Sequence, residues 1–166
     1  MELWDVYDAE GNKTGLAEER QFPMKQGEYH LAMELWIVND RHEILIQKRS
    51  ETKEVLPGIW ALTTGCAKMG ETSLTACLRE AREEIGIGLV PAELRHVRRI
   101  VRADAIWDVY AAKENVDIAQ LTLQAEEVTA VQWVDEGTFR KMLNEGLLYR
   151  YPEIEEMLNE VLKATA

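Results

Sequence analysis

Hydrophobic and polar residues follow one another with two periods along the chain, and these periods predict the elements of the fold. Apolar or alternating runs that end in polar turn residues are typical of β-strands. Such runs occupy residues 3–8, 16–20, 30–38, 43–48, 59–63, 94–101, 105–112 and 128–134. We expect the first two runs to pair antiparallel across the turn at 9–15. The polar turns at 39–42 and 102–104 predict two further hairpins, and the segment 21–27, with Pro23, predicts a loop.

Apolar residues follow a helical period between Thr72 or Ser73 and Gly86. There Leu74, Cys77, Leu78, Ala81 and Ile85 recur at i, i+3, i+4, i+7 and i+11, which predicts an apolar stripe facing a core. Thr72 or Ser73 suits an N-cap, and Gly86 suits the position that ends a helix. Two more helices are expected, from Glu136 to Asn144 and from Tyr151 or Pro152 to Lys163.

Length and composition favour a single α+β domain that spans residues 1–166. The chain has 166 residues, of which 46% are hydrophobic. This is enough to bury one core and too little for two large domains. The sequence contains no internal repeat, linker or low-complexity tract that would divide it.

The acidic residues of the first predicted helix are the most distinctive polar feature. Glu80, Glu83 and Glu84 are spaced i, i+3 and i+4, so they lie on one face beside the apolar stripe. Three carboxylates there repel one another unless a cation or an arginine neutralises them. Hard divalent cations prefer oxygen ligands, and Mg²⁺ commonly joins carboxylates to substrate phosphates. The spacing predicts a metal site, but taken alone it also fits a solvated helix face with ordinary ion pairs.

Glycines around this helix favour the metal site. Gly65 precedes the helix, Gly70 lies in the intervening loop and Gly86 follows the last turn, which indicates a loop–helix–loop of fixed shape. The whole stretch from Gly65 to Ile87 matches G-x5-E-x7-R-E-U-x-E-E-x-G-U, where U is a bulky aliphatic residue and only Ala81 is smaller. Such a match arises by chance with a probability on the order of 10⁻⁵ in a chain this rich in Glu. It resembles the signature of the Nudix family, whose members cleave a nucleoside diphosphate linked to another moiety, using Mg²⁺ or Mn²⁺.

The resemblance extends over roughly residues 28–139, through the segments LIQKRS and LPGIW and a late strand ending in Trp-Val. It implies a Nudix-type α/β/α sandwich with a mixed central sheet. It also implies that a metal-activated water attacks a pyrophosphate bond of a small-molecule phosphoanhydride. The implied metal ligands are Glu80, Glu83, Glu84, the carbonyl of Gly65 and, at the edge, Glu71. Arg79 would orient the glutamates, although a simple helix ion pair would explain it too.

The general base and the phosphate contacts are less narrowly defined. Family members take the base either from the motif helix, where Glu83 is the candidate, or from a distant loop, where Glu126 and Glu127 are. Lys48 and Arg49 end a strand near the motif and are candidate substrate contacts, or plain surface charges. Family members often pair through their N-terminal strands, so the resemblance also allows a homodimer.

Two rival functions use the same scaffold. The opening residues resemble the isopentenyl diphosphate isomerase branch of the superfamily. That branch needs a cysteine just before the motif glycine and a metal-binding histidine after it, whereas this chain has Thr64 and Cys66. A non-catalytic nucleotide-binding regulator is the second rival, but such proteins commonly lose motif glutamates, and this chain retains them. Hydrolase is therefore the favoured interpretation.

Net charge and cysteine content limit which partners and which cellular compartment we expect for the protein. A net charge of −11 and a pI near 4.8 argue against a nucleic-acid or anionic-membrane surface. No run approaches the roughly 18 apolar residues of a membrane span. The N-terminus is acidic and patterned, unlike a signal peptide. Cys66 and Cys77 are the only cysteines and are not placed to pair, so we expect a reduced, cytoplasmic protein.

Overall fold

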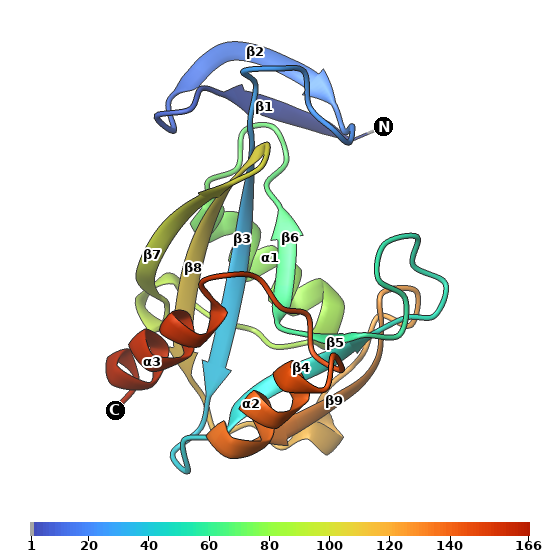
Figure 1. Ribbon diagram of the computed structural model, residues 1–166, viewed down its shortest axis with the longest axis vertical. Coiled ribbons are helices and arrows are strands. Elements are labelled where there is room, and N and C mark those ends of the chain that lie inside the picture. Colours follow the sequence, from blue (N-terminus) through green and yellow to red (C-terminus); the bar gives the residue numbers. More distant parts are fainter. Residues whose placement is uncertain (1) are drawn as a thin grey trace.

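Seven strands from distant parts of the chain form the central sheet of this computed structural model, which describes residues 2–166 (Figure 1). Five of them run in the order β5-β4-β3-β8-β7, while β6 also pairs with β3 and β9 with β4. Their bounds are β3 His30–Val38, β4 Ile44–Arg49, β5 Trp60–Ala61, β6 Thr63–Cys66, β7 Arg95–Arg102, β8 Ala105–Lys113 and β9 Val128–Val134. Every predicted strand of this sheet is present, and the run 59–63 is divided between β5 and the start of β6.

β3 forms the expected hairpin with β4 only beside the turn, and most of its pairing is with other strands. β3 and β4 are paired only at Val38 and Ile44, next to the turn. Beyond that point β3 pairs in parallel with β8 along its whole length and antiparallel with β6. All nine residues of β3 are buried. A strand buried on both faces belongs at the centre of a sheet, so its partners are set by tertiary burial rather than by the nearest turn. The predicted hairpin is present, because β3 and β4 are antiparallel neighbours joined by the turn at 39–42, but its pairing does not extend beyond the turn.

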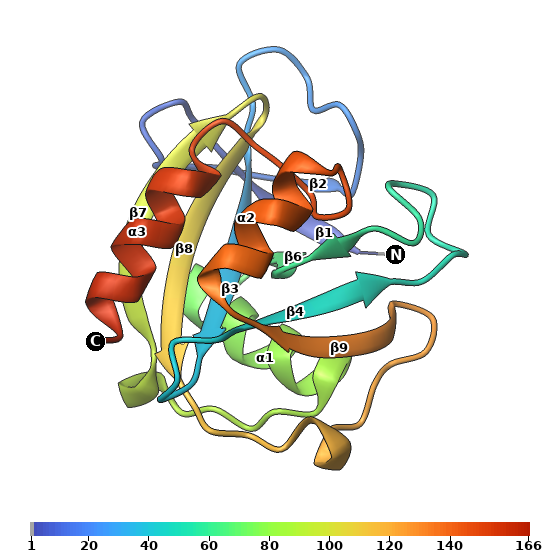
Figure 2. The ribbon, with the colours of Figure 1, turned by 60° about the horizontal axis from the view of Figure 1, so that its bottom comes forward.

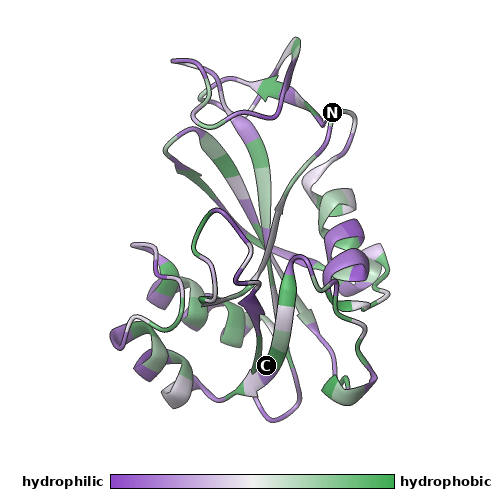
Figure 3. Cartoon of the chain, turned by 90° about the vertical axis from the view of Figure 1, so that its right-hand side faces the viewer, coloured by the Kyte–Doolittle hydropathy of each residue, from purple (hydrophilic) through white to green (hydrophobic). Residues whose placement is uncertain are grey.

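Helices cover both faces of the sheet, as the views in Figures 2 and 3 show. The first, α1 (Ser73–Ile85), packs on one face against alternate residues of β3, namely Met33, Leu35 and Ile37. The other two, α2 (Glu136–Asn144) and α3 (Ile154–Ala164), cover the opposite face, where Trp36 and Val38 lie. Alternate side chains of β3 therefore point to opposite faces of the sheet and pack into two separate hydrophobic cores. The arrangement confirms the predicted α/β/α sandwich with a mixed sheet.

The ends of α1 are fixed by the residues expected there. Thr72 is the N-cap: its side chain accepts the backbone N–H of Thr75, and the Thr75 side chain accepts the N–H of Thr72. Gly86 ends the helix with φ of 74°, in the left-handed region. A Cβ atom at Gly86 would also lie 3.0 Å from the backbone nitrogen of Thr122, so a larger residue would be both strained and crowded.

A separate hairpin of β1 (Leu3–Tyr7) and β2 (Lys13–Glu19) lies beyond one end of the main sheet (Figure 1). β2 begins before residue 16, so the turn between the strands is shorter than expected. The hairpin contacts the loop that precedes α1, because Met69 donates its N–H to the Leu3 carbonyl and Gly70 donates to the Asp5 carboxylate, both at 2.8 Å. These bonds hold the loop that leads into the motif helix.

Short 3-10 helices at Pro91–Glu93 and Ile118–Gln120 complete the described chain. Within residues 2–166, no helix is long and apolar enough to cross a membrane. Cys66 and Cys77 are both free thiols, in agreement with the expectation that they do not pair.

Candidate active site

Arg79 lies at the centre of the acidic cluster on α1. Its guanidinium binds both oxygens of Glu71, at 2.8 and 2.9 Å, in a fork that matches a carboxylate. A second branch reaches Glu80 at 2.8 Å and Glu83 at 3.2 Å. The same side chain also donates to the carbonyl of Cys66 at 3.1 Å, which ties the helix to the end of β6. The hydrogen bond to Glu71, helped by the neighbouring Glu80, raises the pKa of Arg79, so the guanidinium stays charged.

Glu80 and Glu84 are one helical turn apart and face the sheet. Glu84 is buried at 8% exposure, whereas Glu83 is exposed to solvent. Burial, together with repulsion from Glu80, raises the pKa of Glu84 to about 8. Burial also raises the pKa of Glu80, even though Arg79 opposes the shift. The acidic residues therefore do not form one solvated face, since two carboxylates turn inward and are short of positive charge.

A buried pair of polar residues in the sheet holds Glu84. Gln47 on β4 donates to the Glu84 carboxylate at 2.9 Å and accepts a hydrogen bond from the Thr63 hydroxyl at 2.7 Å. The amide is thereby oriented with its N–H toward the acid. Sequence reasoning missed Gln47 and Thr63. The available signal was a single glutamine in the apolar strand ILIQKR, on the same side as the buried Leu45.

Gly65 on β6 lies directly against Glu80. A Cβ atom at this position would lie 2.6 Å from both Cγ and Cδ of Glu80, closer than any stable contact. The glycine therefore allows the carboxylate to approach the strand backbone. This close approach is the physical reason for a glycine at the start of the motif.

The remaining predicted residues are more dispersed. Glu127, before β9, is ion-paired with Lys53, and its charge helps to raise the pKa of Glu84. Arg49 donates from Nε to the carbonyl of Val55 at 3.0 Å. Lys48 is half-buried, and its side chain makes no hydrogen bond or ion pair within the described chain. The catalytic and binding roles of these residues remain predictions, as do those of the motif glutamates.

The donor set suits a hard divalent cation. Among residues 2–166, no three His, Cys, Asp or Glu side chains form a ready-made metal cage. Mg²⁺, however, usually keeps several waters and binds through one or two carboxylates together with substrate phosphates. Glu80 and Glu84 provide two adjacent carboxylates in a partly buried place, where Arg79 is the nearby cation and is already engaged by three glutamates. The pair fits Mg²⁺ or Mn²⁺.

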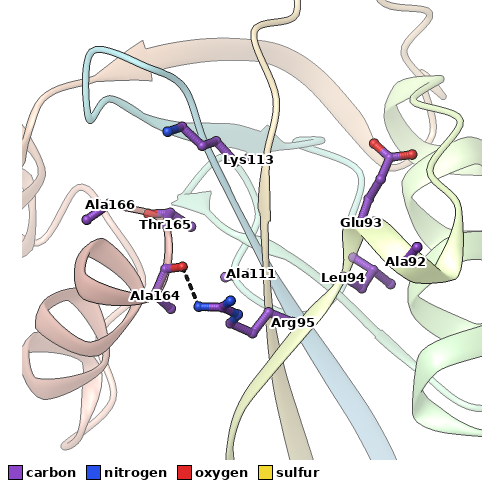
Figure 4. Close-up of a pocket in the computed structure, with 9 residues that line it drawn as sticks. All are labelled: Ala92, Glu93, Leu94, Arg95, Ala111, Lys113, Ala164, Thr165 and Ala166. Carbon is purple, nitrogen blue, oxygen red and sulfur yellow. Dashed lines mark hydrogen bonds between the residues drawn. The ribbon is translucent and has the colours of Figure 1, made fainter.

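Another hollow lies between β7, β8 and the C-terminal end of α3 (Figure 4). Arg95 and Lys113 project into it, and Arg95 donates to the carbonyl of Ala164 at 2.8 Å. None of the motif glutamates lines this hollow. It is therefore not the place where the predicted chemistry occurs.

Comparisons with known proteins identify the family and support the fold. A model of the NUDIX domain matches residues 28–153. An uncharacterized Nudix hydrolase of Listeria monocytogenes is 31% identical over 160 residues, which cover 96% of this chain and 95% of that protein. An isopentenyl-diphosphate Delta-isomerase of Escherichia coli is 27% identical over 139 residues, covering 78% of this chain and 75% of the isomerase. A crystal structure of a Deinococcus radiodurans protein shares the fold with a TM-score of 0.78 at 17% identity, covering 96% of this chain and 99% of that one. The chain belongs to the Nudix family of enzymes that act on phosphoanhydrides.

Proposed function

We propose that this protein is a divalent-metal-dependent hydrolase that cleaves the pyrophosphate bond of a nucleoside diphosphate derivative. One observation carries the proposal: Glu80 lies against the backbone of Gly65 and Glu84 is held one helical turn away by Gln47, with less positive charge nearby than two carboxylates need. A metal ion with a bound diphosphate would supply that charge and connect it to substrate oxygens.

The residues that would hold the metal are Glu80 and Glu84, with Glu83, Glu71 and the Gly65 carbonyl at the margin. When bound, Mg²⁺ or Mn²⁺ supplies neutralisation of phosphate charge and a lowered pKa for water. The protein orients the carboxylates that would bind the metal. Arg79 fixes Glu71 and Glu80 relative to the end of β6, and the Gln47 amide fixes one oxygen of Glu84.

Proton transfer from water requires a carboxylate that is free to accept. Glu83 is exposed and has one bond of 3.2 Å to Arg79, whereas Glu127 is engaged by Lys53. The Lys53 ammonium lies closer to the Glu127 carboxylate than the Arg79 guanidinium lies to that of Glu83, so Glu83 is the more accessible acceptor. We therefore place Glu83 first as the general base and Glu127 second. The comparison to make is the activity of Glu83→Gln with that of Glu127→Gln, and a larger loss in Glu127→Gln would reverse the order.

The isomerase alternative is weakened by two positions on β6. Thr64 stands where the isomerases need a cysteine, and a threonine hydroxyl does not supply the acidity of a thiol. Cys66 stands where they need a metal-binding histidine. Burial raises the pKa of Cys66 to about 12, so its thiol stays protonated and is a poor metal ligand. A regulator without activity is weakened because Glu80, Glu83 and Glu84 are all present.

The test is phosphate release from a panel of nucleoside diphosphate derivatives, with a coupled phosphatase as reporter. We expect turnover of at least one compound that requires added Mg²⁺ or Mn²⁺ and is lost in Glu84→Gln. Glu145→Gln, at the end of α2, is the matched control and should leave turnover unchanged. Isomerisation of isopentenyl diphosphate without hydrolysis of any panel member would contradict the proposal.

A further inference from the structure

The N-terminal hairpin of β1 and β2 contacts the loop between β6 and α1, which reaches up to it in Figure 1. Two consecutive backbone N–H groups of this loop donate to β1. Met69 donates to the carbonyl of Leu3 at 2.8 Å. Gly70 donates to Oδ2 of Asp5, also at 2.8 Å. The second bond ends on a side chain, so a substitution of Asp5 alone removes it.

A tight turn closes between Lys68 and Glu71 and carries the Glu71 carboxylate toward Arg79. Glu71 donates its N–H to the Lys68 carbonyl at 2.9 Å, and Gly70 has a φ of 85°, a value that this kind of turn reserves for glycine. The Glu71 carboxylate accepts the N–H of Lys68 at 2.7 Å and binds Arg79 through both oxygens. The position of Glu71 therefore depends on the shape of the turn, which Asp5 holds from the other side.

The hairpin also packs against a second anchor of Arg79. The guanidinium donates to the carbonyl of Cys66, at the end of β6, at 3.1 Å. The Cys66 side chain packs against a small core formed by Trp4, Val6 and Met24, of which the first two belong to β1. β1 therefore supports both segments outside α1 that bind Arg79, namely the end of β6 and the turn before the helix.

An ordinary ion pair within the hairpin is the alternative role for Asp5. Lys13 on β2 lies 3.2 Å from the same carboxylate oxygen, but its side chain is 54% exposed, whereas that of Asp5 is 19% exposed. Exposed ion pairs contribute little to stability. The bond from Gly70 is shorter, and a backbone N–H on a charged acceptor is among the stronger hydrogen bonds. The main interaction of Asp5 is therefore with the loop.

We propose that Asp5 is a positioning residue of the active site, which fixes the turn that carries Glu71 and so keeps Arg79 directed at Glu80. The inference rests on the proposed function, because the position of Glu80 matters to activity only if Glu80 binds the metal. Residues that support metal ligands contribute a factor of about 10 to 100 in metal affinity or activity. Asp5 acts through Gly70 and Glu71, so we expect the lower end of this range, about 10-fold.

Removal of the acceptor tests this role. Asp5→Ala deletes the carboxylate, whereas Asp5→Asn keeps an oxygen that can accept the Gly70 N–H. Electron paramagnetic resonance measures Mn²⁺ binding in the presence of inorganic pyrophosphate. We expect Asp5→Ala to raise the Mn²⁺ concentration at half-saturation by about 10-fold, and Asp5→Asn to recover most of this loss. An unchanged concentration in a folded Asp5→Ala would overturn the inference.

Two control variants separate this role from the stability of the hairpin. Asp8→Ala removes a carboxylate that accepts the N–H groups of Glu10 and Asn12 in the turn between β1 and β2. Lys13→Gln removes the ion pair but leaves the Gly70 bond in place. Both should keep the Mn²⁺ affinity of the wild type, and urea unfolding reports any loss of stability. A loss of affinity in Asp8→Ala equal to that in Asp5→Ala would reduce the effect to hairpin stability and contradict the proposal.

Hydrogen exchange of the Gly70 amide gives a second readout, in the metal-free protein. We expect slow exchange in the wild type and in Asp5→Asn, and exchange faster by at least about 10-fold in Asp5→Ala, the effect of losing a hydrogen bond to a charged acceptor. Nuclear magnetic resonance resolves this single amide. Equal exchange rates in the wild type and Asp5→Ala would show that Asp5 does not hold the turn.

Turnover keeps this inference distinguishable from the proposed function. If Asp5→Ala weakens Mn²⁺ binding but the wild type hydrolyses no nucleoside diphosphate derivative, the proposed function fails and the role of Asp5 in the metal site stands. If hydrolysis is metal-dependent and Asp5→Ala requires no more Mn²⁺ than the wild type, the proposed function stands and the role of Asp5 is wrong.

Discussion

Two buried glutamates, one on each face of the central sheet, show how surroundings decide what a carboxylate can do. Glu84 lies on the α1 side, among Glu80, Gln47 and the charge of Glu127. Glu34 lies on the side of α2 and α3, among aromatic and apolar side chains, with neutral donors on one oxygen. Burial raises the pKa of both. The first is surrounded by negative charge and so is suited to a cation, whereas the second receives hydrogen bonds from two neutral donors.

A third buried carboxylate, Asp108 on β8, completes the contrast. It is 2% exposed, yet its pKa is lowered. Burial by itself would raise this pKa, but hydrogen bonds from Arg99, Ser73 and His96 more than offset that effect. Asp108 has its cation in the structure, since Arg99 binds both of its oxygens at 2.8 Å. Burial alone therefore does not identify a functional acid. The feature that distinguishes Glu84 from Asp108 is a buried carboxylate whose negative charge is not neutralised by an arginine of its own.

The largest expected effect follows from removing the charge of Glu84. We expect Glu84→Gln to lower metal-dependent kcat/KM by about 1,000-fold, the upper range for loss of one electrostatic element of an active site. Steady-state kinetics at saturating Mg²⁺ measure it, with Glu145→Gln as the control. A loss below about 10-fold in a folded variant would mean that Glu84 is a structural acid like Asp108.

The second effect is on stability and concerns Asp108. Asp108→Asn leaves Arg99 without its buried partner, and we expect the free energy of unfolding to fall by about 3 kcal/mol at pH 7. The folded pKa is lowered, so the stabilisation is complete above the unfolded value of about 3.9 and is lost as pH falls through the folded value. Urea unfolding from pH 7 down to pH 3 should therefore show the wild type and the variant converging. A difference that stays constant with pH would contradict the role given to the charge.

The third effect concerns the close approach of β6 to α1. In Gly65→Ala the new Cβ would displace Glu80, and we expect activity to fall by about 100-fold, since misplacement of about 1 Å costs that much. Gly88→Ala is the matched control, because a Cβ there meets nothing within 4 Å and its φ is not positive. Comparable activity in the two variants would show that Glu80 does not need its observed position.

The smallest effect concerns the orienting arginine. Arg79→Lys keeps the charge but loses the fork that joins Glu71 to Glu80, and we expect kcat/KM to fall by about 30-fold, within the range for residues that support metal ligands. Arg82→Lys, on the exposed side of the same helix, should have no effect. The Mn²⁺ concentration required for half-maximal rate should rise in Arg79→Lys. An unchanged requirement would indicate that Arg79 is an ordinary helix ion pair.

The motif helix and the strands were predictable because local patterns define them. The caps at Thr72 and Gly86, the stripe through Cys77 and Ala81, and the apolar runs of β3 and β8 are all contained in short stretches of sequence. The partners of β3 were not predictable in this way. They depend on burial of the strand on both faces, which arises only when α1, α2 and α3 have packed.

The clustered glutamates could be named from their spacing and Arg79 from the resemblance to the family motif, but the residues that contact them could not. Gln47, Thr63 and Glu34 are buried polar residues within strands, and their partners are 16 or more residues away in the chain, apart from Trp36. Sequence pattern does not reveal such pairs. The extent of the domain over residues 1–166, a homodimer and a cytoplasmic location remain predictions.

The most direct test of the central claim is Mn²⁺ binding measured by electron paramagnetic resonance in the presence of inorganic pyrophosphate. The account predicts bound Mn²⁺ in the wild type and in Glu34→Gln, and its loss in Glu84→Gln. Retention of Mn²⁺ in a folded Glu84→Gln, or its loss only in Glu34→Gln, would place the metal on the wrong face of the sheet and contradict the account.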